Sequence, residues 1–362
     1  MTITIPDCIQ SITPYKPGKP IEELARELGI HNAVKLASNE NPLGPSPKAV
    51  EAIASALSNL HRYPDGAGHN LVTRLSDYWK IAPECFVPGN GSDDLIGMLT
   101  RALLQPGDEV IVPTPSFLMY EINVRSAGAV PVFVPLRSLA IHLDDLIERI
   151  TSRTRMLFIC NPNNPTGAVI SRRNFEAFLQ VLPPDIVVVV DEAYMEFVRD
   201  PDCVRSMVYV KHKAPPVVTL RTFSKAYGLA GLRVGYGVMN PELAGVIHRI
   251  RQPFNTSLLA QAGAVAALGD EDFLNQTVQT VHKGLDYLFE ELSKANIQYF
   301  PTQSNFFLID TKKNADTVFN AMLKLGVIVR SMTSYGYPEY IRVNTGLPEE
   351  NERLIQALKQ VL

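Results

Sequence analysis

Lys225 lies in a stretch of small residues, from Thr222 to Gly237, that reads TFSKAYGLAGLRVGYG. A lysine whose amine is made neutral by burial or by a nearby cation is a nucleophile for carbonyl groups. Arg233 is the candidate cation here, and it could equally clamp a phosphate. A solvated surface lysine is the alternative, which the flanking serines and glycines do not exclude.

Three other polar segments follow apolar runs. The turn GNGSDD (residues 89–94) precedes a predicted helix and offers free backbone N–H groups to an anion, although a plain glycine turn is as good a reading. The turn NPNNPTG (residues 161–167) is stiffened by two prolines and could aim an amide at a ligand. Asp191 comes directly after a buried run, where a carboxylate is costly unless it is paired; a helix cap is the alternative.

Together these segments supply a lysine, a buried carboxylate, a phosphate cradle and a second cation. Pyridoxal phosphate needs this set, because the lysine holds its aldehyde, the carboxylate keeps its pyridine nitrogen protonated, and the cradle and cation hold its phosphate. A nicotinamide site is disfavoured, since Asp94 stands where a third glycine of GxGxxG would be.

The chain between these segments alternates strands with helices. Helices are expected at 94–104 and at 174–182, the second with Ser171 as a possible cap. Apolar strands that alternate with helices indicate an α/β fold with a mostly parallel sheet and helices on both faces. The polar segments would then meet at the carboxyl ends of the strands. The predicted strands cover residues 110–112, 130–134, 156–159, 186–190, 217–220 and 234–238.

After about residue 260 the pattern changes to that of a smaller α+β domain. It has a long helix near 271–295, and the helix at 21–28 is expected to join it. We therefore predict an N-terminal arm at 1–35, a large domain at 36–260 and a small domain at 261–362. Its other predicted elements are strands at 306–309, 327–329 and 341–343, a helix at 315–325 and a terminal helix.

Composition limits the function. The 362 residues carry a net charge of -3, with 46% apolar and 20% charged residues, which disfavours a nucleic-acid or membrane-surface partner. The four cysteines are far apart, so no metal site and no disulfide framework is expected. The start, MTITIPDCIQ, lacks the basic and apolar parts of a secretory signal, so we expect a cytoplasmic protein.

The segments SNENPLGPSP, RYPDG, GNGSDD, NPNNPTG, DEAY, TFSKAYGLAGLRVGY and IRVNTG occur in this order and cover nearly the whole chain. In these motifs the chain resembles the fold-type I pyridoxal-phosphate aminotransferases, and within them the histidinol-phosphate branch. That branch is favoured by PGKPIEELARELG near the start, by Asn39-Glu40-Asn41, and by Arg330 in VIVRSM. The resemblance implies a seven-stranded sheet in the large domain.

The resemblance also implies roles for matching residues. Lys225 looks like the lysine that bonds the cofactor and carries its proton, and Asp191 like the partner of the pyridine nitrogen. Asn164 and Tyr194 look like partners of the cofactor's 3′-oxygen, with Tyr194 counted among the catalytic residues. Phe117 sits where an aromatic ring stacks on the pyridine. The implied phosphate contacts are Gly91, Ser92, Thr222, Ser224 and Arg233, together with Tyr63 from the neighbouring subunit of a homodimer.

On the substrate side, Arg342 resembles the arginine that binds an amino-acid carboxylate. Arg330 and Arg342 together suit the phosphate of histidinol phosphate and also the two carboxylates of glutamate. A surface ion pair is the alternative for Arg330. Tyr15 and Asn41 are weaker candidates for the substrate pocket, and the approach of His61 and His69 to the site is left open.

The implied reaction is a transamination between glutamate and 2-oxoglutarate on one side and histidinol phosphate and imidazole-acetol phosphate on the other, in histidine biosynthesis. Two rivals share the cofactor motifs. One is an aromatic amino acid aminotransferase. The other is a threonine-phosphate decarboxylase, which Glu40 disfavours. A non-enzymatic regulator built on this fold is disfavoured, because no basic region or helix-turn-helix extension is seen.

Overall fold

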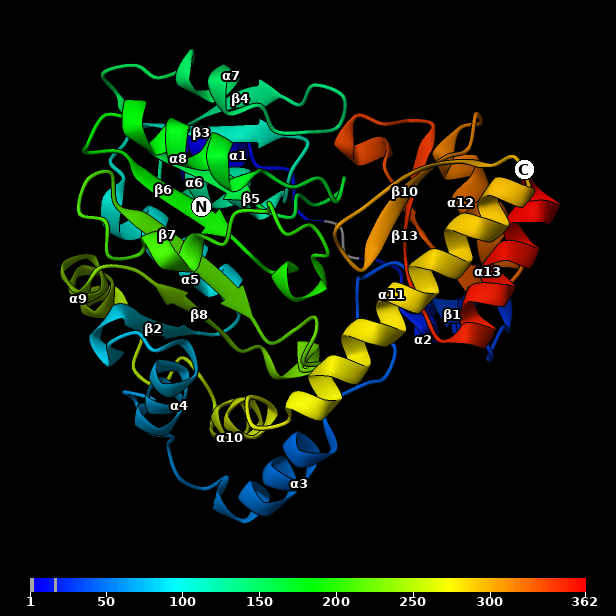
Figure 1. The fold of residues 1–362 in the computed structure, drawn as a ribbon, viewed down its shortest axis with the longest axis horizontal. Helices are drawn as coiled ribbons and strands as arrows, with labels where there is room; N and C mark the ends of the chain where they lie inside the picture. Colours follow the sequence, from blue (N-terminus) through cyan, green and yellow to red (C-terminus); the bar gives the residue numbers. More distant parts are fainter. Residues whose placement is uncertain (1–2, 16–17) are drawn as a thin grey trace.

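The computed structural model describes residues 3–15 and 18–362 of the chain. A seven-stranded sheet with the strand order β2-β8-β7-β6-β5-β3-β4 forms the centre of the larger half (Figure 1). β8 runs antiparallel to β2 and β7, and the other four pairs are parallel, which confirms the predicted mostly parallel sheet. The strands are β2 (Phe86–Gly89), β3 (Glu109–Thr114), β4 (Val130–Pro135), β5 (Thr154–Cys160), β6 (Val187–Asp191), β7 (Val217–Thr222) and β8 (Gly235–Val238).

Helices cover both faces of this sheet, because the buried strands are apolar on both sides. Val189 and Val218 pack on one face with α5 (Ser92–Leu103), α6 (Met119–Ser126) and α9 (Pro241–Ile250). Val188 and Val190 pack on the other face with α7 (Leu143–Ile147) and α8 (Arg172–Val181). Ser171 caps α8 as predicted, since its hydroxyl accepts the amide of Asn174 at 3.3 Å.

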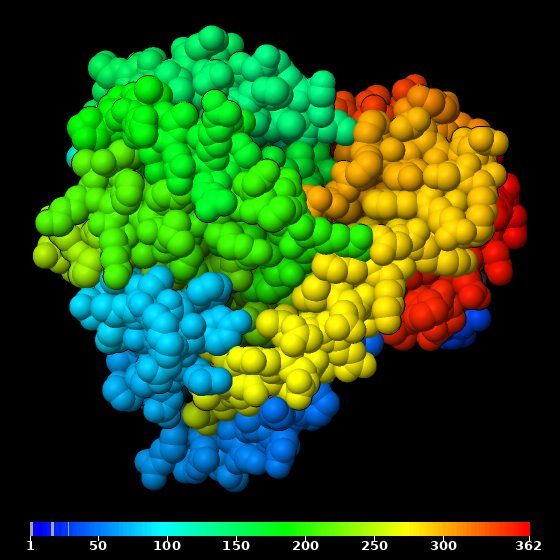
Figure 2. Space-filling view, in the orientation of Figure 1, coloured from blue at the N-terminus to red at the C-terminus, as the bar shows by residue number. Residues whose placement is uncertain are grey.

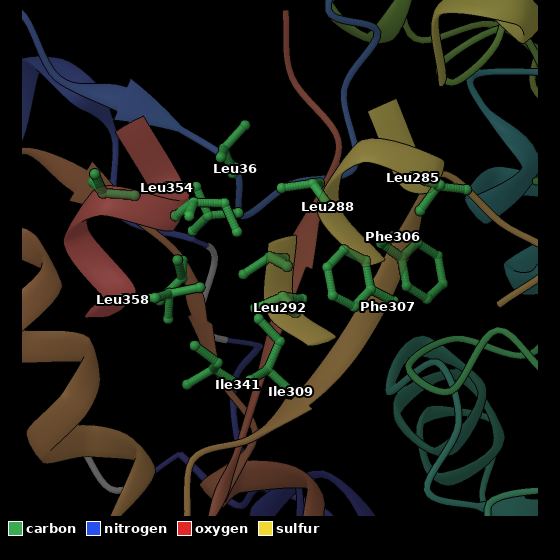
Figure 3. Close-up of a cluster of buried hydrophobic side chains, with 14 of the residues drawn as sticks. Leu36, Leu285, Leu288, Leu292, Phe306, Phe307, Ile309, Ile341, Leu354 and Leu358 are labelled. Carbon is green, nitrogen blue, oxygen red and sulfur yellow. The ribbon is translucent and has the colours of Figure 1, made fainter. Parts of the chain in front are cut away.

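The smaller half contains a four-stranded antiparallel sheet with the order β12-β13-β10-β9. Its core lies between that sheet and two long helices, α11 (Glu271–Lys294) and α13 (Pro348–Val361). In Figure 3, Leu285 and Leu292 of α11 lie beside Phe306 and Phe307, and Leu354 and Leu358 of α13 lie on the far side of the same cluster. In Figure 2, α11 (yellow) runs along the junction of the two halves. The remaining elements here are β9 (Gln298–Phe300), β10 (Phe306–Asp310), α12 (Ala315–Lys324) and β13 (Tyr340–Asn344).

The strand predicted at 327–329 is followed in the structure by a second short strand that was not predicted. The residues at 327–329 form β11 (Val327–Ile328), and the chain then changes sheets to form β12 (Arg330–Ser331). β11 pairs in parallel with β1 (Val34–Lys35), whereas β12 pairs antiparallel with β13. The change of sheet places Arg330 directly opposite Arg342.

The N-terminal arm touches both halves. Leu24 of α2 (Ile21–Leu28) packs with Leu323 and Ile328 of the small domain. α1 (Asp7–Gln10) lies instead against α6 of the large domain. Residues 1–2 and 16–17 of the predicted arm lie outside the described residues.

The predicted boundary at residue 260 falls inside α10 (Leu258–Ala267). Ala260 and Ala264 of this helix are buried with Leu71 of the large domain. We therefore propose that the small domain begins at the turn before α11, near Asp270. The other elements of the large half are α3 (Pro47–Ala56), α4 (His69–Trp79) and the short 3-10 turns η1 (Leu57–Asn59), η2 (Pro83–Cys85), η3 (Met195–Phe197), η4 (Ser206–Tyr209) and η5 (Ala230–Leu232); η6 (Thr333–Tyr335) lies in the small half.

Candidate active site

A pocket lies at the carboxyl ends of β5, β6 and β7, beside the start of α5. This is the edge of a parallel sheet at which ligands bind. The structure brings together here the polar turns that lie far apart in the sequence. The pocket is lined by Ser92, Asp93, Phe117, Cys160, Asn164, Asp191, Ala193, Tyr194, Thr222, Ser224, Lys225 and Arg233.

Lys225 is the candidate nucleophile of this pocket. Its Nζ donates to the carbonyl of Ser38 at 3.1 Å and lies 5.7 Å from the centre of the Tyr194 ring. Burial, followed by the positive charges of Arg342 and Arg233, lowers the pKa of Lys225 to about 8, while Glu40 and Asp191 oppose the fall. The cation with the larger effect is therefore Arg342, whereas the sequence pointed to Arg233. At pH 7 about a tenth of the amines are therefore neutral, far more than for a free lysine.

Asp191 is the last residue of β6 and is buried. The hydroxyl of Tyr120 donates to its Oδ2 at 2.9 Å, and the amide of Ala193 donates to its Oδ1 at 3.2 Å. Burial raises the pKa of Asp191 to about 6, and these two hydrogen bonds oppose the rise because they stabilise the carboxylate. An ionised carboxylate held in this way can pair with a protonated ring nitrogen.

The turn between β2 and α5 forms an anion cradle with Arg233. Gly91 has φ +85° and ψ 168°, a conformation that is essentially restricted to glycine. A Cβ atom on Gly91 would lie 2.7 Å from Nη2 of Arg233, and one on Gly235 would lie 2.5 Å from the amide nitrogen of Ser92. Arg233 Nη1 contacts the hydroxyl of Ser224 at 3.4 Å. The glycines therefore leave open the space in front of the helix N-terminus, where a phosphate binds.

Asn164 and Tyr194 lie across the pocket from this cradle. Arg342 Nη1 donates to Oδ1 of Asn164, so a contact from Asn164 to a ligand oxygen falls to its amide nitrogen. The hydroxyl of Tyr194 accepts from Nδ2 of Asn39 at 3.1 Å, and it can still donate a hydrogen bond.

Two arginines come from the small domain, and one of them, Arg342, reaches the pocket through its bond to Asn164. Arg342 is buried, donates to the carbonyl of Ala37 at 2.8 Å, and has an Nε atom without a hydrogen-bond partner. Arg330 is its direct cross-strand partner and hydrogen-bonds Tyr335. The Arg330 guanidinium lies 5.8 Å from the centre of the Tyr15 ring, so three of the four predicted substrate residues lie together.

The fourth, Asn41, has its side chain engaged within the chain. Its Nδ2 donates to Ala226 O at 3.0 Å and to Thr277 Oγ1 at 3.1 Å, and its Oδ1 accepts from the amide of Leu43 at 2.9 Å. These bonds fasten the 39–45 loop to the lysine loop and to α11. The side chain of Asn41 therefore has a structural role within the chain, and its contact with a substrate stays a prediction.

Tyr63 also lies outside the pocket of its own chain. Its side chain is 82% exposed and stacks on Phe254 at 4.7 Å between ring centres. His61 and His69 are exposed as well and do not line the pocket. Tyr63 therefore does not contribute to the pocket of its own chain.

The residues of the pocket fit pyridoxal phosphate. Arg233, the α5 N-terminus and the hydroxyls of Thr222 and Ser224 match a phosphate, and Asp191 matches a protonated ring nitrogen. Asp93 also lines the pocket, with a buried Oδ1 that has no hydrogen-bond partner. Burial raises the pKa of Asp93, and the positive charge of Arg233 opposes the rise. No group of His, Cys, Asp and Glu residues in the described part of the chain is arranged to hold a metal ion.

A lysine after β7, a ring-nitrogen carboxylate at the end of β6 and a phosphate cradle after β2 define a pyridoxal-phosphate enzyme of fold type I. Sequence and structure comparisons agree with this class. The sequence model of the family described as Aminotransferase class I and II matches residues 31–358. The chain therefore belongs to the class I and II aminotransferases, and it is a pyridoxal-phosphate-dependent transaminase.

Individual relatives cover essentially the whole chain. The histidinol-phosphate aminotransferase of Desulfotalea psychrophila is 44% identical over 100% of this chain and 96% of that protein. The histidinol-phosphate aminotransferase 1 of Nitrosococcus oceani is 45% identical over 98% of this chain and 95% of that protein. The crystal structure of the histidinol-phosphate aminotransferase from Sinorhizobium meliloti in complex with pyridoxal-5′-phosphate has a TM-score of 0.91 at 28% identity, covering 100% of this chain and 98% of that one.

Three residues of the site were not predicted from the sequence. Tyr120 holds Asp191, and its ring stacks on Phe158 at 4.6 Å. Asn39 holds Tyr194 and has φ +56°. Asp93 lines the pocket beside Arg233. Asn39 could have been noticed in the sequence, since asparagine is one of the few residue types that tolerate positive φ. Tyr120 could not, because its contact with Asp191 depends on the packing of α6 against β6.

Proposed function

We propose that this transaminase exchanges the amino group between L-glutamate and 2-oxoglutarate on one side and L-histidinol phosphate and imidazole-acetol phosphate on the other, as a step of histidine biosynthesis. The curated relatives described above bear the name of this activity along the whole chain. An aromatic amino acid aminotransferase would need the same cofactor residues, so the substrate must be argued from the arginines.

The observation that carries the substrate proposal is the pairing of Arg330 with Arg342. Like charges directly opposite each other in an antiparallel pair repel, and an anionic group bound near both would relieve that repulsion. In addition, Nε of Arg342 is a buried donor without a partner. Two adjacent guanidinium groups suit a phosphate dianion, and they also suit the second carboxylate of glutamate. A neutral phenyl side chain gives no such anion.

The side chains can divide the work of the reaction among them. When bound, pyridoxal phosphate supplies the aldehyde that takes up the amino group and a ring that accepts the electron pair of the broken Cα–H bond. Lys225 Nζ, when it is not bonded to the cofactor, takes the proton from the Cα atom of the substrate. It delivers this proton to the cofactor's aldehyde carbon. Asp191 keeps a proton on the ring nitrogen. Tyr194 and Asn164 hold the oxygen beside the reacting carbon, and Arg330 and Arg342 orient the anionic end of the substrate.

We propose that the working unit is a homodimer in which Tyr63 reaches the cofactor phosphate of the partner subunit. The exposed Tyr63–Phe254 pair supports this, because an aromatic stack of this kind is typical of an interface.

We also propose that the protein works in the cytoplasm, since Cys85, Cys160 and Cys203 are buried free thiols, as in a reducing compartment. Among the described helices, none is long and apolar enough to cross a bilayer.

The variant Arg330→Met tests the substrate proposal. We expect its kcat/KM for L-histidinol phosphate to fall about 10- to 100-fold, the size of one lost charge-assisted contact, whereas that for L-histidinol, which lacks the phosphate, changes little. Arg137→Met is the matched control, because Arg137 pairs with Asp145 on the exposed surface. An equal loss for both substrates, or a wild-type preference for phenylalanine, would contradict the proposal.

A further inference from the structure

A buried ion cluster lies behind the cofactor pocket. Arg221 donates from Nη1 to Glu192 Oε2 at 2.9 Å and from Nη2 to Glu196 Oε1 at 2.6 Å. The three side chains are 5%, 0% and 9% exposed. The catalytic roles assigned above use none of these three residues.

The cluster is fixed on its remaining sides. The amide and hydroxyl of Ser206 donate to Oε1 of Glu192 at 2.5 and 2.8 Å, so both oxygens of this carboxylate are engaged. The Arg221 guanidinium lies 5.1 Å from the centre of the Trp79 ring, and Trp79 in turn donates to Tyr236 at 2.8 Å. The guanidinium is thus held between two carboxylates and an aromatic face.

The position of the cluster along the chain gives it a purpose. Glu192 directly follows Asp191, and Glu196 comes two residues after Tyr194, so one carboxylate of the cluster adjoins each of the two groups. Arg221 lies on β7, immediately before the Thr222–Lys225 segment. The last backbone hydrogen bond between the Asp191–Tyr194 turn and β7 is the one that the Glu192 amide donates to Leu220 O at 2.9 Å. Beyond that point, the Arg221–Glu196 bond ties the far end of the turn to β7.

We propose that Arg221 is a positioning residue that clamps the Asp191–Tyr194 turn to the lysine-bearing end of β7 through Glu192 and Glu196. The clamp fixes the distance between the ring-nitrogen carboxylate, the 3′-oxygen partner and the nucleophilic amine. This role concerns the cofactor, so it does not depend on which amino donor the enzyme prefers.

Stability alone is a poor reason for such a cluster. Removing two carboxylates and a guanidinium from water costs several kcal/mol per ion, and replacing a whole buried ion cluster by uncharged groups of similar volume is often neutral or stabilising. An arginine is needed rather than a lysine, because its planar fork reaches two carboxylates in fixed directions. The cluster is therefore suited to setting geometry.

The test compares two variants with the wild type, each studied first as cofactor-free protein. The triple variant Arg221→Met/Glu192→Gln/Glu196→Gln removes all three charges at nearly constant volume. The single variant Glu196→Gln keeps the Arg221–Glu192 pair and weakens the hold on the far end of the turn. Arg137→Met is the control for loss of an ion pair on the surface. The measurements are the melting temperature, the Kd of pyridoxal phosphate by titration, the pH dependence of the bound cofactor's absorption band, and kcat.

We expect the triple variant to melt near the wild-type temperature, to bind pyridoxal phosphate about tenfold more weakly and to have kcat reduced roughly 10- to 100-fold, as for a misplaced reacting group. The midpoint of the absorption change should move as well, because the groups that set it have shifted. Glu196→Gln should show the same changes to a smaller extent.

Wild-type Kd and absorption midpoint in the folded triple variant would overturn the proposal, and so would losses that only follow a lowered melting temperature. If the triple variant does not fold, Glu196→Gln decides the matter. Wild-type cofactor affinity, absorption midpoint and kcat in that variant would leave the cluster a structural feature and refute the clamp.

Discussion

At the scale of single residues, Lys225 illustrates how burial and charge combine. Its amine is held against Ser38 O, with Arg233 in the same pocket and Arg342 close enough for its charge to act on the amine. Both burial and these cations favour the neutral amine, which is the form that attacks an aldehyde. The pKa of about 8 places the loss of the proton close to neutral pH.

This pKa can be tested by following cofactor capture. The rate at which cofactor-free protein takes up pyridoxal phosphate should rise as pH increases through about 8, because only neutral Lys225 reacts. Arg342→Met should move the midpoint upward, since a nearby positive charge that lowers the pKa is lost. Stopped-flow absorbance against pH measures both. Two controls apply: Arg137→Met should leave the midpoint in place, and Lys225→Ala should capture no cofactor covalently. A midpoint that is unchanged or lower in Arg342→Met would contradict the electrostatic account.

At the scale of elements, the turn between β2 and α5 determines the phosphate cradle. The turn requires a positive φ at Gly91, which favours glycine. It also requires the absence of a Cβ atom at Gly91, so that the Arg233 guanidinium has space. The helix that follows then presents free N–H groups to the phosphate.

The change Gly91→Ala separates these two requirements when it is paired with Gly107→Ala. Gly91→Ala should weaken pyridoxal phosphate binding about tenfold, because its methyl group displaces the Arg233 guanidinium from a charge-assisted contact. Gly107 has φ +88° and no neighbouring atom within 4 Å of the place that a Cβ would occupy, so Gly107→Ala carries backbone strain without the displacement. Both variants should lose roughly 1–3 kcal/mol of stability, and only the first should lose affinity. Titration of cofactor-free proteins measures the Kd, and equal affinities would contradict this reading.

The elements were largely predictable, because strand and helix patterns are local. The runs before Asn161, Asp191 and Thr222 predict strands, and a parallel sheet brings their carboxyl ends together. The change of sheet after β11 was not predictable, since it depends on the pairing of β11 with β1 nearly 300 residues earlier. For the same reason the like-charged pair Arg330–Arg342, the Tyr120–Asp191 bond and the Arg221 cluster could not be read from spacing: each joins residues from elements whose contact is decided by packing.

At the scale of the whole molecule, the single chain has a complete lysine pocket but leaves Tyr63 exposed on its surface. If Tyr63 completes the site of a partner subunit, each site takes Lys225 from one chain and Tyr63 from the other. That arrangement can be tested without a structure of the dimer.

Co-expression of Lys225→Ala with Tyr63→Ala should give a heterodimer with one intact site. In that site the lysine comes from the Tyr63→Ala chain, and the tyrosine comes from the Lys225→Ala chain. We expect the purified heterodimer to have the wild-type Kd for pyridoxal phosphate at half the sites and about half the wild-type activity, since the sites are equivalent by symmetry. A heterodimer no better than the Tyr63→Ala homodimer would show that Tyr63 serves its own chain or no site.

The central claim is that this transaminase acts on histidinol phosphate, and a single half-reaction tests it most directly. Purified enzyme loaded with pyridoxal phosphate is titrated separately with L-histidinol phosphate, L-glutamate and L-phenylalanine while the cofactor's absorption is recorded. We predict that histidinol phosphate and glutamate convert the aldehyde form of the cofactor fully to its amine form, with histidinol phosphate reacting at least about 10-fold faster than phenylalanine, since Arg330 and Arg342 would bind its phosphate. Conversion by phenylalanine as fast as by histidinol phosphate, or no conversion by histidinol phosphate, would contradict the claim.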